Sequence, residues 1–303
     1  MQNKRNQEKI REEFGSKTNG IFSGCIGALD GWLVRIRCPT LKEVANPGKY
    51  YSRKGFYGIN VQVIVDKKKR ILWRYIGEKG SGHDSPAFNE SKLGKKLEFM
   101  AEDLMQQGIY IVGDSAYAIR SYLLTPFDNA APGSSEDAFN FYLSNMRIYV
   151  ECTFGEIDRR WGILWRPLDG KLESHKYTIY SCMRLHNFIV DWRENDKVSA
   201  EGSDIESGNA GEAHERYELD IAADQFMVEN MYGVMGGVLL DGEEEELRRR
   251  GRRTDKETRL RTAGTNLRFF MRDKVWQAGL HRPTGIRFRN NGVRDRHHPV
   301  VVV

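Results

Sequence analysis

The chain has 303 residues, of which 40% are hydrophobic and 29% are charged, and its net charge is +5. This length and apolar content exclude a largely disordered chain and leave room for one large domain with a further segment. Four cysteines without a C-x-x-C pair exclude a disulfide framework and favour a reducing compartment. The sequence has no apolar run of about 18 residues and its N-terminus is charged, so we expect neither a membrane span nor a secretory signal.

Charge is distributed along the chain in three blocks. Residues 1–193 hold 29 basic and 22 acidic residues, residues 194–247 hold 2 and 16, and residues 248–303 hold 16 and 4. Such blocks are typical of flexible or partner-binding segments. We predict a polar N-terminal arm (1–20), which is either a helix fragment or a loose segment, a folded domain (21–193), an acidic flexible linker (194–247) and a basic C-terminal segment (248–303). The basic blocks favour a polyanionic partner, with nucleic acid first, although solvated charged surfaces explain them equally well.

The folded domain is predicted to begin with three strands. Residues 24–39 form an apolar run with Asp30 in its middle. Residues 57–66 and 71–77 are rich in β-branched and aromatic residues, and the short turn K-K-K-R joins them in the pattern of an antiparallel hairpin. The first strand therefore carries an isolated acid.

A glycine-rich loop and a helix come next, in the stretch G-S-G-H-D-S-P-A-F. Ser85 and Pro86 are the residue types preferred at the N-cap and the first position of a helix, and Asp84 suits the positive end of the helix dipole. Asp84 is therefore either a capping residue, the more frequent case, or a metal ligand. Apolar residues spaced by three and four predict that the helix continues over residues 93–108, and the glycine spacing matches no phosphate-binding fingerprint.

The stretch Y-I-V-G-D-S-A-Y, residues 110–117, predicts a short buried strand that ends at Asp114. Either Asp114 closes a turn by accepting a hydrogen bond from its own backbone, or it stands beyond the end of a strand, where α/β sheets bind ligands. The following L-L-T-P-F predicts another short strand.

A long helix is predicted over the segment that contains residues 143–164, whose apolar residues step by three or four. Glu151 falls at one edge of this apolar stripe beside Arg147, and Glu156 falls on the opposite side. Glu151 is either a surface residue paired with Arg147 four positions before it, or a residue that borders a cleft.

Beyond residue 193 the pattern weakens. The acidic, glycine- and serine-rich linker contains an apolar island at residues 226–240. The cluster R-R-R-G-R-R at residues 248–253 is either a nuclear import or nucleic-acid patch, or a solvated charge run. Helical spacing from Leu267 onward predicts a helix that packs back on the folded domain.

Three isolated acids form a single site if the first and fourth strands are neighbours in the sheet and the long helix crosses their ends. Asp30, Asp114 and Glu151 then converge, and converging carboxylates are tolerated mainly when a cation neutralises them. Oxygen ligands favour Mg²⁺ or Mn²⁺, and two such ions can activate an attacking oxygen and stabilise the leaving oxygen at phosphorus. Such chemistry requires a polyanionic substrate, and it agrees with the basic residues near the first strand, which are Arg35, Arg37, Lys42, Lys49, Arg53 and Lys54.

An ordered set of segments resembles the DDE endonuclease domain of PIF/Harbinger-type transposases and their domesticated relatives. The segments occur in the family's order over residues 21–190, and they are GALDGWLVRI, YYSRKGFYGINVQVIVD, SGHDSPAF, YIVGDSAY followed by LLTPF, and FNFYLSNMRIYVECTFGEIDRRWGILWRPL. Each motif is weak alone, and the ordered set is specific. The resemblance implies an α/β, RNase H-like fold: a mixed sheet that starts with three antiparallel strands, flanked by helices, with a charged C-terminal extension.

The resemblance carries the catalytic and metal-binding triad onto Asp30, Asp114 and Glu151, the last being the Glu that precedes T-F-G, and not onto Glu156. It implies metal-dependent cleavage of DNA, with Mg²⁺ or Mn²⁺ as cofactor, followed by strand transfer of the freed 3′-hydroxyl. It also implies DNA as partner, action in the nucleus and at least a dimer.

Three basic residues are candidate DNA contacts. Arg35 and Lys49 belong to the basic surroundings of the first strand, and Arg147 either contacts a phosphate or braces Glu151. The resemblance also includes the element L-H-N at residues 185–187, in which we interpret His186 as a core residue.

Two features depart from the family. Family members generally have a longer N-terminal region that includes a helix-turn-helix, whereas 29 residues precede Asp30. This difference has three possible explanations: a decayed copy, an incomplete gene model, or reliance on a separate DNA-binding protein partner. Asp158 stands where many relatives have Lys, which reduces DNA contact. The predicted function is a metal-dependent DNA endonuclease or transposase; the alternatives are a catalytically inactive domesticated transposase that binds nucleic acid and, more remotely, a phosphoesterase that acts on RNA.

Overall fold

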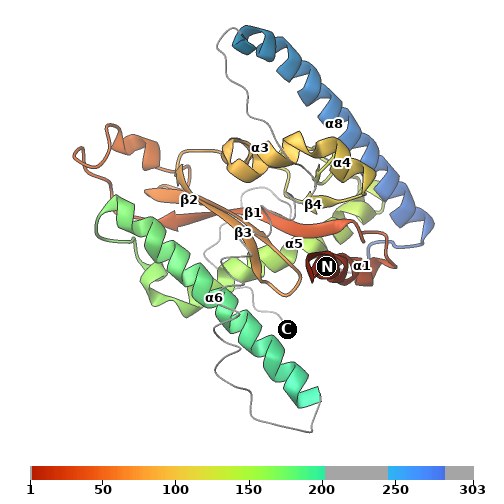
Figure 1. Cartoon of the computed structure of the whole chain (residues 1–303), viewed down its shortest axis with the longest axis horizontal. Helices are drawn as coiled ribbons and strands as arrows, with labels where there is room; N and C mark the ends of the chain where they lie inside the picture. Colours follow the sequence, from red (N-terminus) through yellow and green to blue (C-terminus); the bar gives the residue numbers. More distant parts are fainter. Residues whose placement is uncertain (1, 202–244, 284–303) are drawn as a thin grey trace.

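A five-stranded mixed sheet forms the centre of the protein in a computed structural model that describes residues 2–201 and 245–283 (Figure 1). The strand order is β3-β2-β1-β4-β5. Strands β1, β2 and β3 pair antiparallel, whereas β4 pairs parallel with β1 and β5 parallel with β4. The strand bounds are β1 Cys25–Arg35, β2 Gly58–Val65, β3 Ile71–Lys79, β4 Tyr110–Val112 and β5 Leu123–Leu124. The predicted start of three antiparallel strands is confirmed.

The register of β1 assigns its residues to two faces of the sheet. Directly paired residues of antiparallel strands point to the same face, and neighbours along a strand point to opposite faces. Asp30 pairs with Val63, and Gly31 pairs with Gln62. Asp30 therefore shares a face with the core residues Val63 and Trp32, whereas Gly31 and Gln62 belong to the other face.

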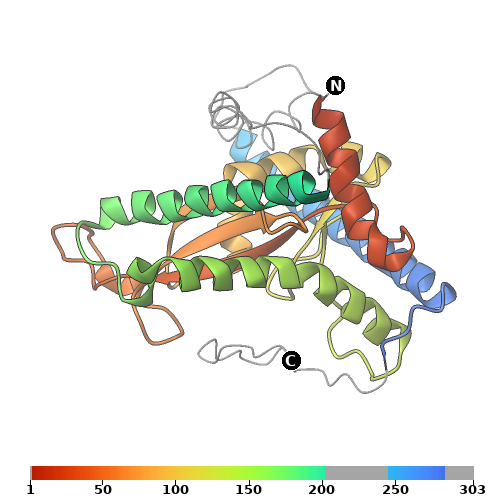
Figure 2. The same cartoon turned by 90° about the horizontal axis from the view of Figure 1, so that it is seen from below.

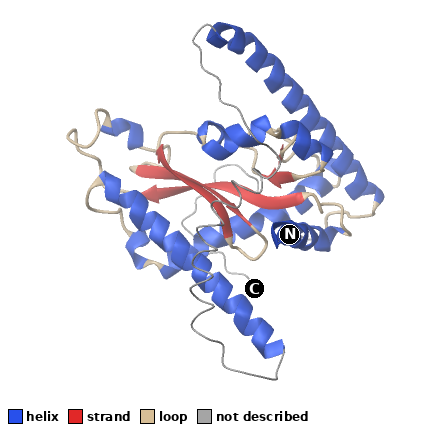
Figure 3. Ribbon diagram, in the orientation of Figure 1, coloured by secondary structure: helices blue, strands red, loops and turns tan. Residues whose placement is uncertain are grey.

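Helices cover both faces, as Figure 3 shows. Helix α5 (Ser135–Arg160) lies on the face to which Asp30 belongs, where Phe154 stacks on Trp32 with 5.6 Å between ring centroids. Helix α6 (Leu172–Glu201) joins α5 in the same buried cluster, and Figure 2 shows the two long helices along this side of the sheet. The other face carries α2 (Asp84–Glu90), α3 (Lys92–Phe99) and α4 (Ala101–Gln106).

The single helix predicted across residues 86–108 is wrong, because the chain breaks it into α2, α3 and α4. Ser91 is extended, with ψ of 155°, and its hydroxyl accepts a hydrogen bond from the backbone N–H of Gly94 at 3.0 Å, so it starts α3 as an N-cap. Ser85 is not the N-cap of α2: that helix begins at Asp84 with His83 as N-cap, and the Ser85 hydroxyl instead accepts a hydrogen bond from Ala118 N at 3.2 Å.

The L-H-N element of α6 fastens the β2–β3 hairpin to the helix layer. His186 is fully buried, and its Nε2 lies 2.8 Å from the carbonyl oxygen of Lys69. The amide of Asn187 accepts a hydrogen bond from Ile71 N at 2.8 Å and donates one to Ile71 O at 2.9 Å, so it continues the edge of β3 as a strand would. The interpretation of His186 as a core residue is confirmed.

Segments at both ends of the chain pack on this core. Residues 1–20, expected as an arm, contain helix α1 (Gln2–Gly15), whose Phe14 is buried against Tyr149. Helix α8 (Glu245–Gln277) covers the outer strand β5, where Gly264 lies against the backbone of Arg120 and Arg268 donates a hydrogen bond to Pro126 O at 2.9 Å. The predicted return of a C-terminal helix is confirmed, and the cover protects a sheet edge from pairing with other chains.

Other predicted segments lie partly outside the described residues. Helix α6 continues past the expected boundary at residue 193 to Glu201, and residues 202–244, with the apolar island and most of the predicted linker, are not described. The cluster at residues 248–253 lies within α8, and its side chains are not described. No helix in the described part of the chain is both long and apolar enough to span a lipid bilayer.

Candidate active site

The sheet brings two of the predicted acids to the same level on neighbouring strands. Ala28 of β1 is the parallel partner of Val112 of β4. Asp30 and Asp114 each follow these partners by two residues, so they lie side by side at the C-terminal side of this pair. Asp30 is nearly fully buried, whereas Asp114 stands in the loop that leaves β4.

Helix α5 supplies the third acid and, one turn earlier, a buried arginine between all three. Nη2 of Arg147 lies 3.6 Å from Oδ2 of Asp30, 3.9 Å from Oδ2 of Asp114 and 3.6 Å from Oε1 of Glu151. Because all three carboxylate oxygens lie within 3.9 Å of the same nitrogen, they also lie close to one another. The structure thus brings together Asp30, Asp114 and Glu151, which we call the acid triad.

Asp114 makes the local turn contact that was one of its two alternatives, whereas ligand binding beyond the strand end, the other alternative, stays a prediction. Its Oδ1 accepts a hydrogen bond from Ala116 N at 2.9 Å, which is a local turn contact, while its Oδ2 faces Arg147. Asp30 is held in a similar way, because its Oδ1 accepts a hydrogen bond from Gly31 N at 2.8 Å and its Oδ2 faces Arg147. In both aspartates one oxygen fixes the carboxylate and the other points to the centre of the triad.

Glu156, the other glutamate of this part of α5, has different partners. It forms an ion pair with Lys69 of the hairpin turn, and its second oxygen lies 3.9 Å from Nη1 of Arg193. The helix thus separates two glutamates five residues apart, and only Glu151 joins the acid triad. Its predicted pairing with Arg147 is also present, but as part of a cluster of three acids.

A buried polar network on the opposite face of the sheet supports the loop that carries Asp114. Oδ1 of Asp84 accepts hydrogen bonds from Asn60 Nδ2 and Gln62 Nε2, both at 2.9 Å, and the hydroxyl of Tyr117 donates one to Gln62 Oε1. Burial raises the pKa of Tyr117 well above its usual value, and the nearby charges of Asp84, Asp30 and Asp114 raise it further. Tyr117 is therefore a neutral hydrogen-bond donor that anchors residues 114–117.

Sequence reasoning missed this network, although one signal was present. Asn60 and Gln62 are two polar residues at alternate positions in an otherwise apolar strand, so they share one face of the sheet. Asp84 accepts both amides at the start of α2, and its own side chain caps no helix in the described structure. It lies on the Gly31 face, opposite to Asp30, because a Cβ at Gly31 would fall 2.0 Å from Oδ1 of Asp84.

The predicted DNA contacts lie in two different environments. Lys49 is exposed in the short helix η2 (Pro47–Tyr50), and Arg35 ends β1 with its guanidinium 4.5 Å from the centre of the Phe56 ring. Both belong to the segment that continues β1 beyond Asp30. Arg147, in contrast, is only 5% exposed and faces the acid triad.

The donor set of the acid triad fits a hard divalent cation. Three carboxylates surround one positive charge, and carboxylate oxygens are the ligands that Mg²⁺ and Mn²⁺ prefer. Among the described residues no three His, Cys, Asp or Glu side chains already lie in a position to hold an ion. In the acid triad the guanidinium of Arg147 lies close to all three carboxylates.

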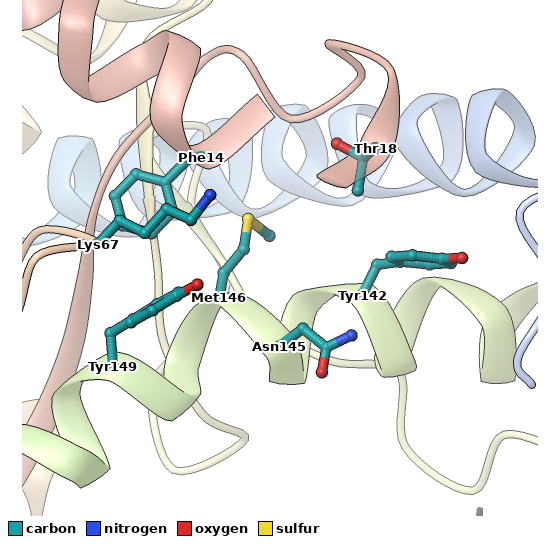
Figure 4. Close-up of a pocket in the computed structure, with 7 residues that line it drawn as sticks. All are labelled: Phe14, Thr18, Lys67, Tyr142, Asn145, Met146 and Tyr149. Carbon is teal, nitrogen blue, oxygen red and sulfur yellow. The ribbon is translucent and has the colours of Figure 1, made fainter. Parts of the chain in front are cut away.

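A small pocket between α1 and α5 is separate from the acid triad (Figure 4). Its lining residues are Phe14, Thr18, Lys67, Tyr142, Asn145, Met146 and Tyr149. Nζ of Lys67 donates hydrogen bonds to Glu13 O at 2.8 Å and to Ser16 Oγ at 2.6 Å, so this lysine fastens α1 to the hairpin turn. The pocket holds none of the predicted site residues.

Comparison with known proteins gives a family match over the segment that contains the acid triad. A family model described as "DDE superfamily endonuclease" matches residues 29–187. Relatives include the protein named "Putative nuclease HARBI1" of Rattus norvegicus, 26% identical over 73% of this chain and 61% of that protein, and "Protein ALP1-like" of Arabidopsis thaliana, 27% identical over 62% of this chain and 48% of that protein. This chain thus spans about half to three-fifths of their length. No solved structure gives a significant match.

Proposed function

The chain belongs to the DDE superfamily endonucleases, and we propose that it cleaves phosphodiester bonds of DNA with Asp30, Asp114 and Glu151 and with Mg²⁺ or Mn²⁺ as cofactor. The observation that carries this proposal is the convergence of the three acids on one cationic centre. We further propose that the fold is RNase H-like, which the strand order β3-β2-β1-β4-β5 and the antiparallel start of the sheet support.

The residues of the acid triad have distinct tasks in this proposal. Asp30 is the most buried of the three, so its charge is the one that most requires a bound cation. Asp114 is fixed by its turn and presents one oxygen, and Glu151 closes the site from the helix layer. A divalent ion, when bound, polarises the phosphodiester and favours ionisation of the attacking water. Strand transfer of the freed 3′-hydroxyl is a further step that the family resemblance suggests.

The DNA backbone is proposed to lie along the basic segment that follows β1. Lys49 is exposed there, and Arg35 stands at the end of the strand that carries Asp30. Phosphate contacts of this kind supply affinity that falls as the salt concentration rises. We propose that the protein acts in the nucleus as at least a dimer, alone or with a separate DNA-binding protein, because transposon ends are cleaved in pairs.

A second candidate is a catalytically inactive, domesticated transposase that binds nucleic acid. The guanidinium of Arg147 in the middle of the acid triad favours this alternative, because it stands at the position that a catalytic cation would need. Asp158, an acid next to the helix segment of the site, also disfavours close approach of DNA there.

Nicking of supercoiled plasmid separates these functions. We expect the purified chain to nick DNA with Mg²⁺ or Mn²⁺ and not with EDTA, and Asp30→Asn, Asp114→Asn and Glu151→Gln to abolish the activity. Glu156→Gln is the matched control, since this glutamate lies on the same helix but pairs with Lys69, and it should keep activity. Salt-dependent DNA binding without cleavage would refute the endonuclease proposal and favour the inactive transposase that binds nucleic acid. Cleavage of RNA in preference to duplex DNA would identify an RNA phosphoesterase.

A further inference from the structure

Arg147 is held by charge rather than by directional hydrogen bonds. Its three contacts with the acid triad, at 3.6, 3.9 and 3.6 Å, are all longer than a hydrogen bond between nitrogen and oxygen. Its Nε is buried and has no hydrogen-bond partner among the described residues. A buried structural arginine normally forms a bidentate, fully hydrogen-bonded pair, so this guanidinium is weakly fixed for its degree of burial.

Arg147 and the acid triad form a cluster of opposite charges that is partly withdrawn from water. The side chains of Arg147 and Asp30 are 6% and 4% exposed, so both charges are withdrawn from water. The side chains of Asp114 and Glu151 are 29% and 27% exposed, so water and small ions reach the cluster from their side. The arginine thus occupies the inner end of a site whose outer end is open.

We infer that Arg147 is the internal counter-cation of the acid triad, and that it competes with the divalent metal for the three carboxylates. This inference rests on the proposed function for the identity of the metal. Among the described residues, Arg147 is a cation that contacts all three acids, and a divalent ion that bound the same oxygens would compete with its guanidinium. Arg147 is then a positioning residue that sets the metal concentration at which the site becomes active, rather than a contact to DNA phosphate.

The experiment measures Mn²⁺ binding to the full chain by electron paramagnetic resonance of the free ion, together with thermal unfolding with and without Mn²⁺. Arg147→Met removes the charge and keeps an unbranched side chain. We expect it to bind Mn²⁺ roughly tenfold or more tightly than the wild type, because a like charge about 4 Å from the ion is removed. Without metal the variant should unfold at a lower temperature, and Mn²⁺ should raise this temperature more than it does in the wild type.

Two further variants keep the inference open to refutation. Arg147→Lys retains the charge, so its Mn²⁺ affinity should stay near that of the wild type, even if Arg147→Met does not fold. Arg272→Met is the control for the general loss of an ion pair. Arg272 pairs with Glu136 at 2.8 Å and does not contact the acid triad, so this substitution should not change Mn²⁺ affinity.

The outcomes test the counter-cation role of Arg147 and the metal-dependent function separately. Unchanged or weaker Mn²⁺ binding by Arg147→Met, or a loss of stability that Mn²⁺ does not restore, overturns the counter-cation inference and leaves a structural or phosphate-binding arginine. Mn²⁺ binding that disappears in Asp114→Asn supports the metal site independently of Arg147. Absence of Mn²⁺ binding in every form of the protein, in contrast, overturns both the inference and the metal-dependent function.

Discussion

Replacement of Gly31 by alanine should destabilise the protein strongly, although alanine usually favours folding over glycine. Gly31 follows Asp30 on β1 and faces the polar network of the opposite layer. A Cβ at this position would lie 2.0 Å from Oδ1 of Asp84 and 2.9 Å from Nε2 of Gln62, and real Cβ atoms essentially never come within 3.0 Å of another heavy atom. Asp84 must therefore withdraw from the sheet.

The cost follows from the bonds that Asp84 makes. Its withdrawal breaks the hydrogen bonds from Asn60 and Gln62, each of which is a bond to a charged acceptor. Two such bonds at the lower end of their range correspond to about 3 kcal/mol, and the lower end applies because Asp84 is only half-buried and regains water. The conformational gain from Gly to Ala is about 0.4–1 kcal/mol, so the clash decides the sign.

Urea unfolding followed by tryptophan fluorescence measures this loss. Gly155→Ala is the matched control, because a Cβ at Gly155 in helix α5 meets no atom within 4 Å, and it should stabilise the protein by about 0.5–1 kcal/mol. In an Asp84→Ala background the cost of Gly31→Ala should largely disappear, since the clashing carboxylate is absent. A Gly31→Ala protein within about 0.5 kcal/mol of the wild type, or an equal cost in both backgrounds, would refute the close contact of α2 with β1.

Three further variants test other parts of the structure. Asn187→Ala should cost about 2–4 kcal/mol in the same unfolding assay, because it leaves the N–H and C=O of Ile71 buried without partners, and a loss below about 1 kcal/mol would contradict the role of this amide. Burial raises the pKa of Asp66 to about 7, whereas an unfolded Asp titrates near 3.9. The protonated side chain therefore stabilises the fold; this stabilisation is fully present below about pH 4 and is lost as the pH rises through 7. Asp66→Asn does not titrate, and its stability relative to the wild type should therefore rise by about 2–3 kcal/mol between pH 5 and pH 8; a constant difference would show that Asp66 stays hydrated. Tyr117→Phe should weaken plasmid nicking while the protein stays folded, as it frees the loop of Asp114 from Gln62, and unchanged nicking would remove Tyr117 from the site.

Local pattern predicted the parts of the fold in which one signal dominates. The β-branched and aromatic runs of β2 and β3, the turn between them and the short strand before Asp114 all occur as expected. The break of the predicted helix into α2, α3 and α4 was not foreseen, because Ser91 and Gly94 are compatible with a helix interior in isolation. Their effect depends on the close approach of the two helices, where a Cβ at Gly94 would fall 2.1 Å from Phe88 O.

The members of the acid triad were predictable only through the family resemblance, which selects Glu151, because the residues alone left the strand order and the helix crossing as assumptions. The central position of Arg147 was not, since the sequence shows an ordinary pair with Glu151 four residues later and says nothing of Asp30 and Asp114. The polar network around Asp84 was likewise hidden, because its members lie on β2, α2 and the loop after β4. Contacts between segments distant in sequence decide both features.

A crystal structure of the full chain grown with Mn²⁺, with the ion located by its anomalous scattering, tests metal binding by the acid triad most directly. We expect a Mn²⁺ ion bonded to carboxylate oxygens of Asp30 and Asp114 and facing Glu151, with the Arg147 guanidinium displaced from its position between them. Saturating Mn²⁺ that leaves Arg147 between the three acids, or that binds only elsewhere, would contradict a metal-dependent acid triad.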